Sequence, residues 1–106
     1  MPHNMEKYIM KPVKRVEFII DSLEVDHLLD SLAKINIKSY TVLREAYGSG
    51  DRGIRGGDIF SGAFDNSYVL IACTETEATE IIETVRPVLK KLGGMCLVSD
   101  AQWVKH

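Results

Sequence analysis

The residues best suited to chemistry lie in one glycine-rich segment near the middle of the chain. Residues 48–58 read GSGDRGIRGGD, so Arg52 and Arg55 lie inside a cluster of glycines. Arginine presents a planar, permanently charged guanidinium that matches phosphate or carboxylate, and glycine lets a ligand approach the backbone closely. The segment runs from about Gly48 to Asp65, which is too long for a hairpin turn. It is predicted to be an anion-binding loop, with a solvated surface loop as the alternative.

Length and charge narrow the class of protein. At 106 residues the chain fits one domain, and we expect a flexible N-terminal tail over 1–12 and a single domain over 13–106. The net charge of −2 argues against nucleic acid as a partner. No apolar run has the length of a membrane span, and the N-terminus does not resemble a signal peptide. A cytoplasmic location is expected.

The cysteines and histidines do not form a recognisable site. Cys73 and Cys96 each lie in an apolar, strand-like run without metal-ligand spacing, so buried structural thiols are expected. His3, His27 and His106 are scattered along the chain. The sequence therefore predicts no metal site and no catalytic residues.

The first half of the chain predicts a strand, a helix and a second strand. Val13–Ile20 alternates between apolar and polar residues, which is typical of a strand. The run Asp21–Glu24 resembles a capping box and opens a helix that ends near Asn36. Ser39–Tyr47 is rich in β-forming residues and predicts the second strand.

The second half repeats the pattern in the order strand, helix, strand. Ser67–Cys73 is almost continuously apolar, which predicts a central strand buried on both faces. Thr74–Glu77 caps a second helix, in which Pro87 removes one backbone bond and is expected to cause a bend. Gly93–Gly94 ends that helix, and Met95–Val104 forms the last strand.

The order of these elements predicts the fold class. A βαββαβ order is the ferredoxin-like plan of an α+β protein, with a four-stranded antiparallel sheet and both helices on one face. The long loop would join strands two and three. The other face of the sheet would expose apolar side chains, so we infer a homo-oligomer that buries it.

Three segments resemble a known family. They are the strand KSYTV at 38–42, the loop GSGDRGIR at 48–55 and the final strand GMCLVSDAQWV at 94–104. Together they resemble the PII superfamily of trimeric signalling proteins, and most closely its PII-like, SbtB-like carbon-sensing branch. The resemblance covers about residues 13–104.

The resemblance implies a regulatory protein that binds an adenine nucleotide in the cleft between neighbouring subunits of a homotrimer. AMP and ADP are favoured over ATP with magnesium and 2-oxoglutarate, bicarbonate is a candidate second ligand, and no permanently bound cofactor is expected. The nucleotide-binding residues carried over by position are Thr41 near the adenine, Gly48 and Gly50 for close backbone approach, Arg52 and Arg55 for phosphate, and Lys90 and Gly94 before the last strand.

The resemblance also implies how a signal leaves the molecule. The long loop corresponds to the T-loop of the superfamily, and its apolar tip, with Ile59, Phe60 and Phe64, would dock on a partner. That partner would be a membrane transporter, which would recruit the protein to the inner face of the membrane, or a protein of carbon metabolism. No tyrosine lies between Gly48 and Phe64, so the uridylylation of nitrogen-sensing PII proteins is not expected.

Three functions remain open from the sequence. The first is a nucleotide-sensing regulator in inorganic-carbon or bicarbonate transport or metabolism. The second is a PII-type regulator of nitrogen or of another transporter. The third is a small ferredoxin-like phosphate-ester enzyme, such as an acylphosphatase, whose phosphate loop would follow strand one rather than strand two.

Overall fold

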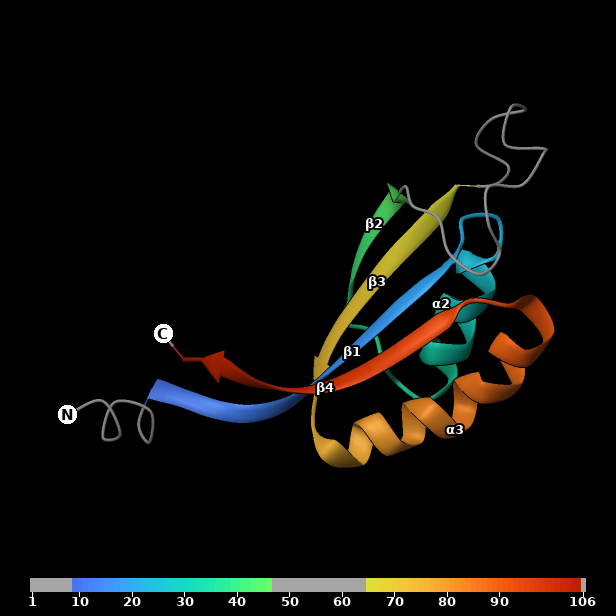
Figure 1. The fold of residues 1–106 in the computed structure, drawn as a ribbon. Helices are drawn as coiled ribbons and strands as arrows, with labels where there is room; N and C mark the ends of the chain where they lie inside the picture. The colour runs from blue at the N-terminus through green and yellow to red at the C-terminus, as the bar shows by residue number, and fades with distance from the viewer. Residues whose placement is uncertain (1–8, 47–64, 106) are drawn as a thin grey trace.

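The computed structural model describes residues 9–46 and 65–105. Their element order confirms the predicted βαββαβ plan (Figure 1). The elements are β1 (Met10–Asp21), α2 (Val25–Lys34), β2 (Thr41–Ala46), β3 (Asn66–Cys73), α3 (Glu75–Leu92) and β4 (Met95–Val104). The predicted bounds of the last strand are confirmed, and the preceding glycine pair marks its start.

The described strands form one antiparallel sheet in the order β2-β3-β1-β4. Strands β1 and β3 are central, whereas β2 and β4 form the two edges. Both helices lie on the same side of this sheet, as Figure 1 shows. The ferredoxin-like fold class predicted from the sequence is therefore confirmed.

The hydrophobic core lies between the sheet and the two helices. Each central strand contributes every second residue to it, since neighbouring side chains of a strand point to opposite faces. The buried apolar residues are Val16, Phe18 and Ile20 of β1; Val25, Leu28 and Leu32 of α2; Ile37 between α2 and β2; Val69, Ile71 and Cys73 of β3; and Ala78, Ile81 and Val85 of α3.

Strand β3 differs from the expectation that both of its faces are buried. Ser67, Val69, Ile71 and Cys73 are buried, but the residues between them are partly or fully exposed. The prediction was wrong for the single chain because both helices cover the same face of the sheet. The opposite side, called the open face below, has no covering layer among the described elements.

Strand β1 begins three residues before the predicted start. Met10, Lys11 and Pro12, assigned to the tail from the sequence, pair with Val104, Trp103 and Gln102 of β4. Proline lacks a backbone N–H, but Pro12 lies beyond the pairing with β3, where β1 has a single neighbour. Proline is tolerated at such a position.

The turn between β1 and α2 is not the predicted capping box. The Asp21 carboxylate accepts a hydrogen bond from the Leu23 amide at 2.9 Å, and the Glu24 amide donates to the Asp21 carbonyl at 2.8 Å. This local turn uses the aspartate before the helix begins. The helix then starts at Val25 and ends at Lys34, just before Asn36, which has a left-handed φ of 64°.

The second helix has the capping box that the sequence predicts. The Glu77 amide donates to the Thr74 hydroxyl at 3.1 Å, and the Thr74 amide donates to the Glu77 carboxylate at 2.9 Å. Two otherwise unpaired amides of the first turn are thereby satisfied. The helix continues through Pro87, and the bend predicted there stays a prediction.

We expect Thr74→Ala to lower the free energy of unfolding by about 1 kcal/mol, because it removes the hydroxyl of the capping box. Thr76→Ala is the matched control, since Thr76 is an exposed residue in the same helical turn. Urea denaturation at one fixed protein concentration measures both variants. Equal stability of the two would show that the box contributes nothing.

Candidate functional site

Three of the predicted nucleotide-binding residues lie in the described part of the chain: Thr41, Lys90 and Gly94. The other four, Gly48, Gly50, Arg52 and Arg55, lie outside the described residues, as do the docking residues Ile59, Phe60 and Phe64. The roles given to these residues therefore stay predictions.

Thr41 is the first residue of β2 and is exposed. It pairs with Leu70 of β3. Its neighbour Val42 packs against the core, so Thr41 lies on the open face, at one edge of the sheet. This position leaves its hydroxyl accessible to a ligand or to a neighbouring molecule.

Gly94 joins α3 to β4 at the other edge of the sheet. Its φ is +113°, a conformation that residues with a side chain rarely adopt, and a Cβ there would lie 3.0 Å from the Ile19 carbonyl oxygen. Close packing against β1 therefore explains the glycine without any ligand. Gly93, with φ 81°, ends the helix, and its amide donates a hydrogen bond to the Leu89 carbonyl at 2.7 Å.

Lys90 is exposed in the last turn of α3. A cation at a helix C-terminus interacts favourably with the helix dipole. The structure thus gives Lys90 a stabilising position close to Gly94 along the chain, with its ammonium open to solvent.

A single chain does not bring the two edges together. Thr41 lies on β2 and Gly94 precedes β4, so two central strands separate them. At about 4.8 Å between neighbouring strands, the lateral separation is roughly 14 Å. Thr41 and Gly94 can approach one ligand most closely where the β2 edge of one copy meets the β4 edge of another.

The exit of the long loop is held by a group of polar contacts that the sequence did not predict. The Ser22 amide donates to the Asp65 carbonyl at 2.8 Å, and the Ser22 and Ser67 hydroxyls lie 2.8 Å apart. Ser67 is fully buried. These contacts join Asp65, the last residue of the loop segment, and Ser67 of β3 to the β1–α2 turn. The contact between Ser22 and Ser67 was not predicted, because the sequence of this turn resembles a capping box.

A second unpredicted group lies on the open face. The Tyr68 hydroxyl donates to the Glu17 carboxylate at 2.5 Å, Arg15 lies 3.3 Å from the same carboxylate, and the Arg15 Nε donates to the Ser99 hydroxyl at 3.2 Å. The hydrogen bond to Glu17, followed by burial, raises the pKa of Tyr68 above its ordinary value. The tyrosine stays protonated and continues to donate near neutral pH.

Exposed apolar side chains surround this polar group. Strand alternation places Ile19, Leu43, Met95 and Leu97 on the open face, and each is at least 37% exposed in the single chain. Contiguous apolar surface of this kind usually marks an interface. The Tyr68 hydroxyl and the Glu17 carboxylate at its centre already have partners within the chain, which lowers the cost of covering them.

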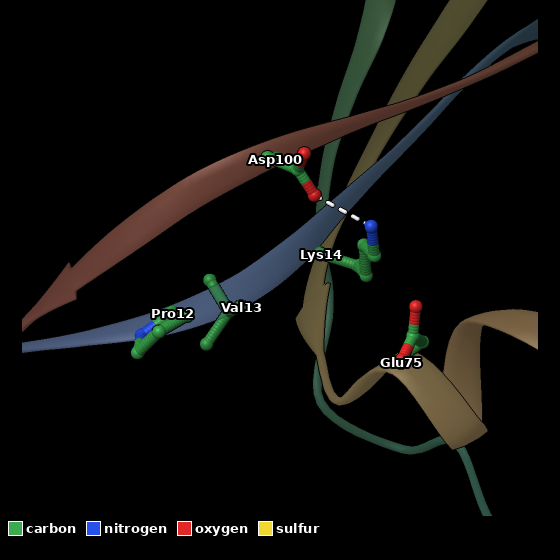
Figure 2. A pocket seen from close by; sticks show the side chains of 5 residues that line it. All are labelled: Pro12, Val13, Lys14, Glu75 and Asp100. Atoms are coloured by element: carbon green, nitrogen blue, oxygen red, sulfur yellow. Dashed lines mark hydrogen bonds and ion pairs between the residues drawn. The ribbon is translucent and has the colours of Figure 1, made fainter.

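A shallow hollow of about 240 Å³ lies where β1 meets the start of α3. Figure 2 shows the Lys14 ammonium directed at Asp100, with Glu75 nearby. The ammonium lies 2.5 Å from the Asp100 carboxylate, which is the main cause of its raised pKa. Two carboxylates against one cation disfavour a phosphate ligand, so this hollow is not a nucleotide site.

Neither cysteine lies in an environment that favours a reactive thiolate. Cys73 is buried and Cys96 is partly buried, and burial raises the pKa of both thiols. A raised pKa lowers the fraction of reactive thiolate.

In the described ranges, no group of three or more histidine, cysteine or acidic side chains is placed to hold a metal ion. Nor is any helix in those ranges long and apolar enough to cross a membrane.

Comparison with known proteins identifies a family for most of the chain. The model of the P-II family, described as nitrogen regulatory protein P-II, matches residues 13–106. No curated protein matches the sequence at a significant level.

Solved structures share the fold. CPII, a nitrogen regulatory PII-like protein from Thiomonas intermedia K12 with ADP, AMP and bicarbonate bound, is 23% identical, with a TM-score of 0.76 over 91% of this chain and 92% of that one. A putative PII-like signalling protein from Thermus thermophilus is 24% identical, with a TM-score of 0.70 over 91% of this chain and 93% of that one.

We expect Gly94→Ala to lower the free energy of unfolding by about 1–3 kcal/mol, because the new Cβ would meet the Ile19 carbonyl in a strained conformation. The measurement is denaturation without nucleotide, which separates the packing role from any ligand role. Lys91→Ala, in the exposed last turn of α3, is the control. A stable Gly94→Ala protein would leave ligand approach as the reason for the glycine.

Proposed function

The chain belongs to the P-II family of nitrogen regulatory proteins, and we propose that it binds an adenine nucleotide at the clefts between its subunits and regulates a partner in inorganic-carbon physiology. Members of this family are signalling regulators and not enzymes. The phosphate-ester enzyme considered from the sequence is therefore set aside. The observation that carries the proposal is the family match over residues 13–106.

The predicted loop chemistry favours a nucleotide. Arg52 and Arg55 supply two guanidinium groups for the phosphates, while Gly48 and Gly50 allow the backbone amides to approach them. The fold neighbour CPII is described with ADP and AMP bound. We infer that ADP and AMP are the ligands of this chain as well.

A shared site is the arrangement that best uses the described residues. Thr41 and Gly94 lie at opposite edges of the sheet, and the open face is apolar. In a closed ring of copies, the β2 edge of one subunit can meet the β4 edge of the next. Thr41, Lys90 and Gly94 would then surround one nucleotide together with the loop arginines. A homotrimer is consistent with the family.

Inorganic carbon is the favoured signal, with nitrogen regulation as the second candidate. CPII is described as bound to ADP and bicarbonate, and this chain has no tyrosine in the loop for uridylylation. The loop tip with Ile59, Phe60 and Phe64 would dock on a membrane transporter or on a protein of carbon metabolism. Calorimetry with bicarbonate and with 2-oxoglutarate, each added to the ADP complex, distinguishes the two signals.

We expect Arg52→Ala and Arg55→Ala each to weaken ADP binding about tenfold or more, because a hydrogen bond to a charged group contributes about 1.5–3 kcal/mol. Isothermal titration calorimetry with AMP, ADP and ATP measures the change. Arg86→Ala, which removes an exposed arginine from α3, is the matched control. Unchanged affinity in both loop variants would place the phosphates elsewhere.

The trimer is tested separately from the ligand. Light scattering should return three times the 11.9 kDa chain mass at micromolar concentration, with or without nucleotide, because the open face and not the loop supplies the burial. Leu97→Glu, on the open face, should dissociate the assembly, whereas Asp30→Ala on the exposed side of α2 should leave it intact. A monomeric wild-type protein would contradict the shared site.

A further inference from the structure

The far ends of β1 and β4 leave the sheet as a two-stranded arm. We define the arm as residues 9–13 and 101–105. The pairing of β1 with β3 stops at Lys14, whereas its pairing with β4 continues to Met10, and the Lys105 amide still donates to the Ile9 carbonyl at 2.6 Å. Figure 1 shows the two strand ends extending together, away from the helices.

One face of the arm has a uniform character. Cross-strand partners in an antiparallel pair share a face, and the register places Lys11 beside Trp103 and Val13 beside Ala101. Ile9 and Lys105 continue the same face outward. Trp103 is 51% exposed and Ile9 is 37% exposed. The face is thus an apolar strip with two lysines, and Asp100 lies on the opposite face with Lys14.

An isolated two-stranded ribbon is at best marginally stable in water. Within the described residues, neither α2 nor α3 accompanies the arm to its end (Figure 1). Trp103 is half-exposed on this ribbon, and tryptophan is enriched at interfaces because of its large apolar surface. The flat strip is also unlike a small-molecule site, which is concave.

The strip continues the open face of the sheet. Val13 and Ala101 follow Arg15 and Ser99 at the two-residue spacing that keeps side chains on one face. A molecule that covers Ile19, Leu43, Met95 and Leu97 can therefore contact Trp103 on the same side of the sheet. Residues 9–12 of the arm precede the segment that the family model matches, whereas residues 101–105 with Trp103 lie inside it.

Charge also favours a copy of this chain as the occupant. The strip carries Lys11 and Lys105 and no acidic residue. The exposed surface of α3 offers the opposite charge in its first half, at Glu75, Glu77, Glu80 and Glu83. The complementary surface thus exists on the molecule itself.

We propose that the arm lies across a second copy of this chain, with Trp103 as its apolar anchor and Lys11 and Lys105 at its rim. Buried tryptophans at interface centres commonly dominate the binding free energy. The inference rests on the proposed trimer, but it assigns a separate contact to residues outside the sheet faces. The arm of each subunit would thereby tie neighbouring subunits together.

Trp103 is the single tryptophan of the chain, so its fluorescence reports on the arm alone. In the assembled protein we expect an emission maximum at shorter wavelength than that of N-acetyltryptophanamide, and acrylamide quenching reduced severalfold. A trimer by light scattering whose Trp103 is quenched as readily as the free amide would overturn the inference and leave the proposed function intact. A monomer would instead overturn the trimer on which both depend.

Substitution gives a second, independent readout. We expect Trp103→Ala to raise the concentration at which the trimer dissociates at least about tenfold, and Trp103→Phe to restore most of the loss. Gln102→Ala, one residue away and on the opposite face of the arm, is the control. Equal dissociation of the Trp103→Ala and Gln102→Ala proteins would contradict the proposal. So would a trimer whose exposed Trp103 shifts its emission only on vesicles of anionic lipid, since the occupant would then be a membrane.

Discussion

Strand β1 has neighbours on both edges and presents two chemically different faces. It pairs with β3 on one side and with β4 on the other, so its register fixes the whole sheet. Val16, Phe18 and Ile20 enter the core, while the residues between them point to the open face. A slip of one residue would exchange these two sets and expose the core residues. The core and the open face therefore depend on the same strand pairing.

The strand register also explains why a charged residue, Glu17, is tolerated on the open face. Glu17 lies between two core residues of β1. Its carboxylate accepts a hydrogen bond from Tyr68 on the neighbouring strand β3 and forms an ion pair with Arg15 of β1 itself. A carboxylate with two partners can be covered by a neighbouring molecule at much lower cost than an unpaired one. The same contacts restrict how another copy can pack, because only the surrounding apolar side chains remain available for burial.

Much of the fold was predictable because the relevant signals are local. The capping box lies within the four consecutive residues Thr74–Glu77, and a glycine pair marks the start of β4. The misassigned Asp21 shows the limit of such signals, since its carboxylate bonds the Leu23 amide and forms a turn before the helix. The early start of β1 was missed because its evidence lies in β4, at the other end of the chain.

The candidate site was less predictable for a similar reason. The pair of Glu17 and Tyr68 joins residues 51 positions apart, and only the strand register brings them together. Gly94 was assigned to the ligand from the sequence, whereas the structure also gives it a packing role against Ile19. Thr41 and Gly94 lie at opposite sheet edges, so their relation depends on a second molecule, which no pattern within one chain specifies.

A site divided between two copies couples ligand binding to assembly. If the nucleotide contacts the β2 edge of one subunit and the β4 edge of the next, the complete site exists only in the assembled state. A ligand that binds only that state stabilises it by mass action, and the coupling is reciprocal, so whatever tightens the subunit contacts tightens nucleotide binding by the same factor. The exit of the loop is fixed to the β1–α2 turn through Ser22 and Asp65. Asp65 therefore fixes, on its own subunit, one end of the segment to which the phosphate contacts of Arg52 and Arg55 are proposed.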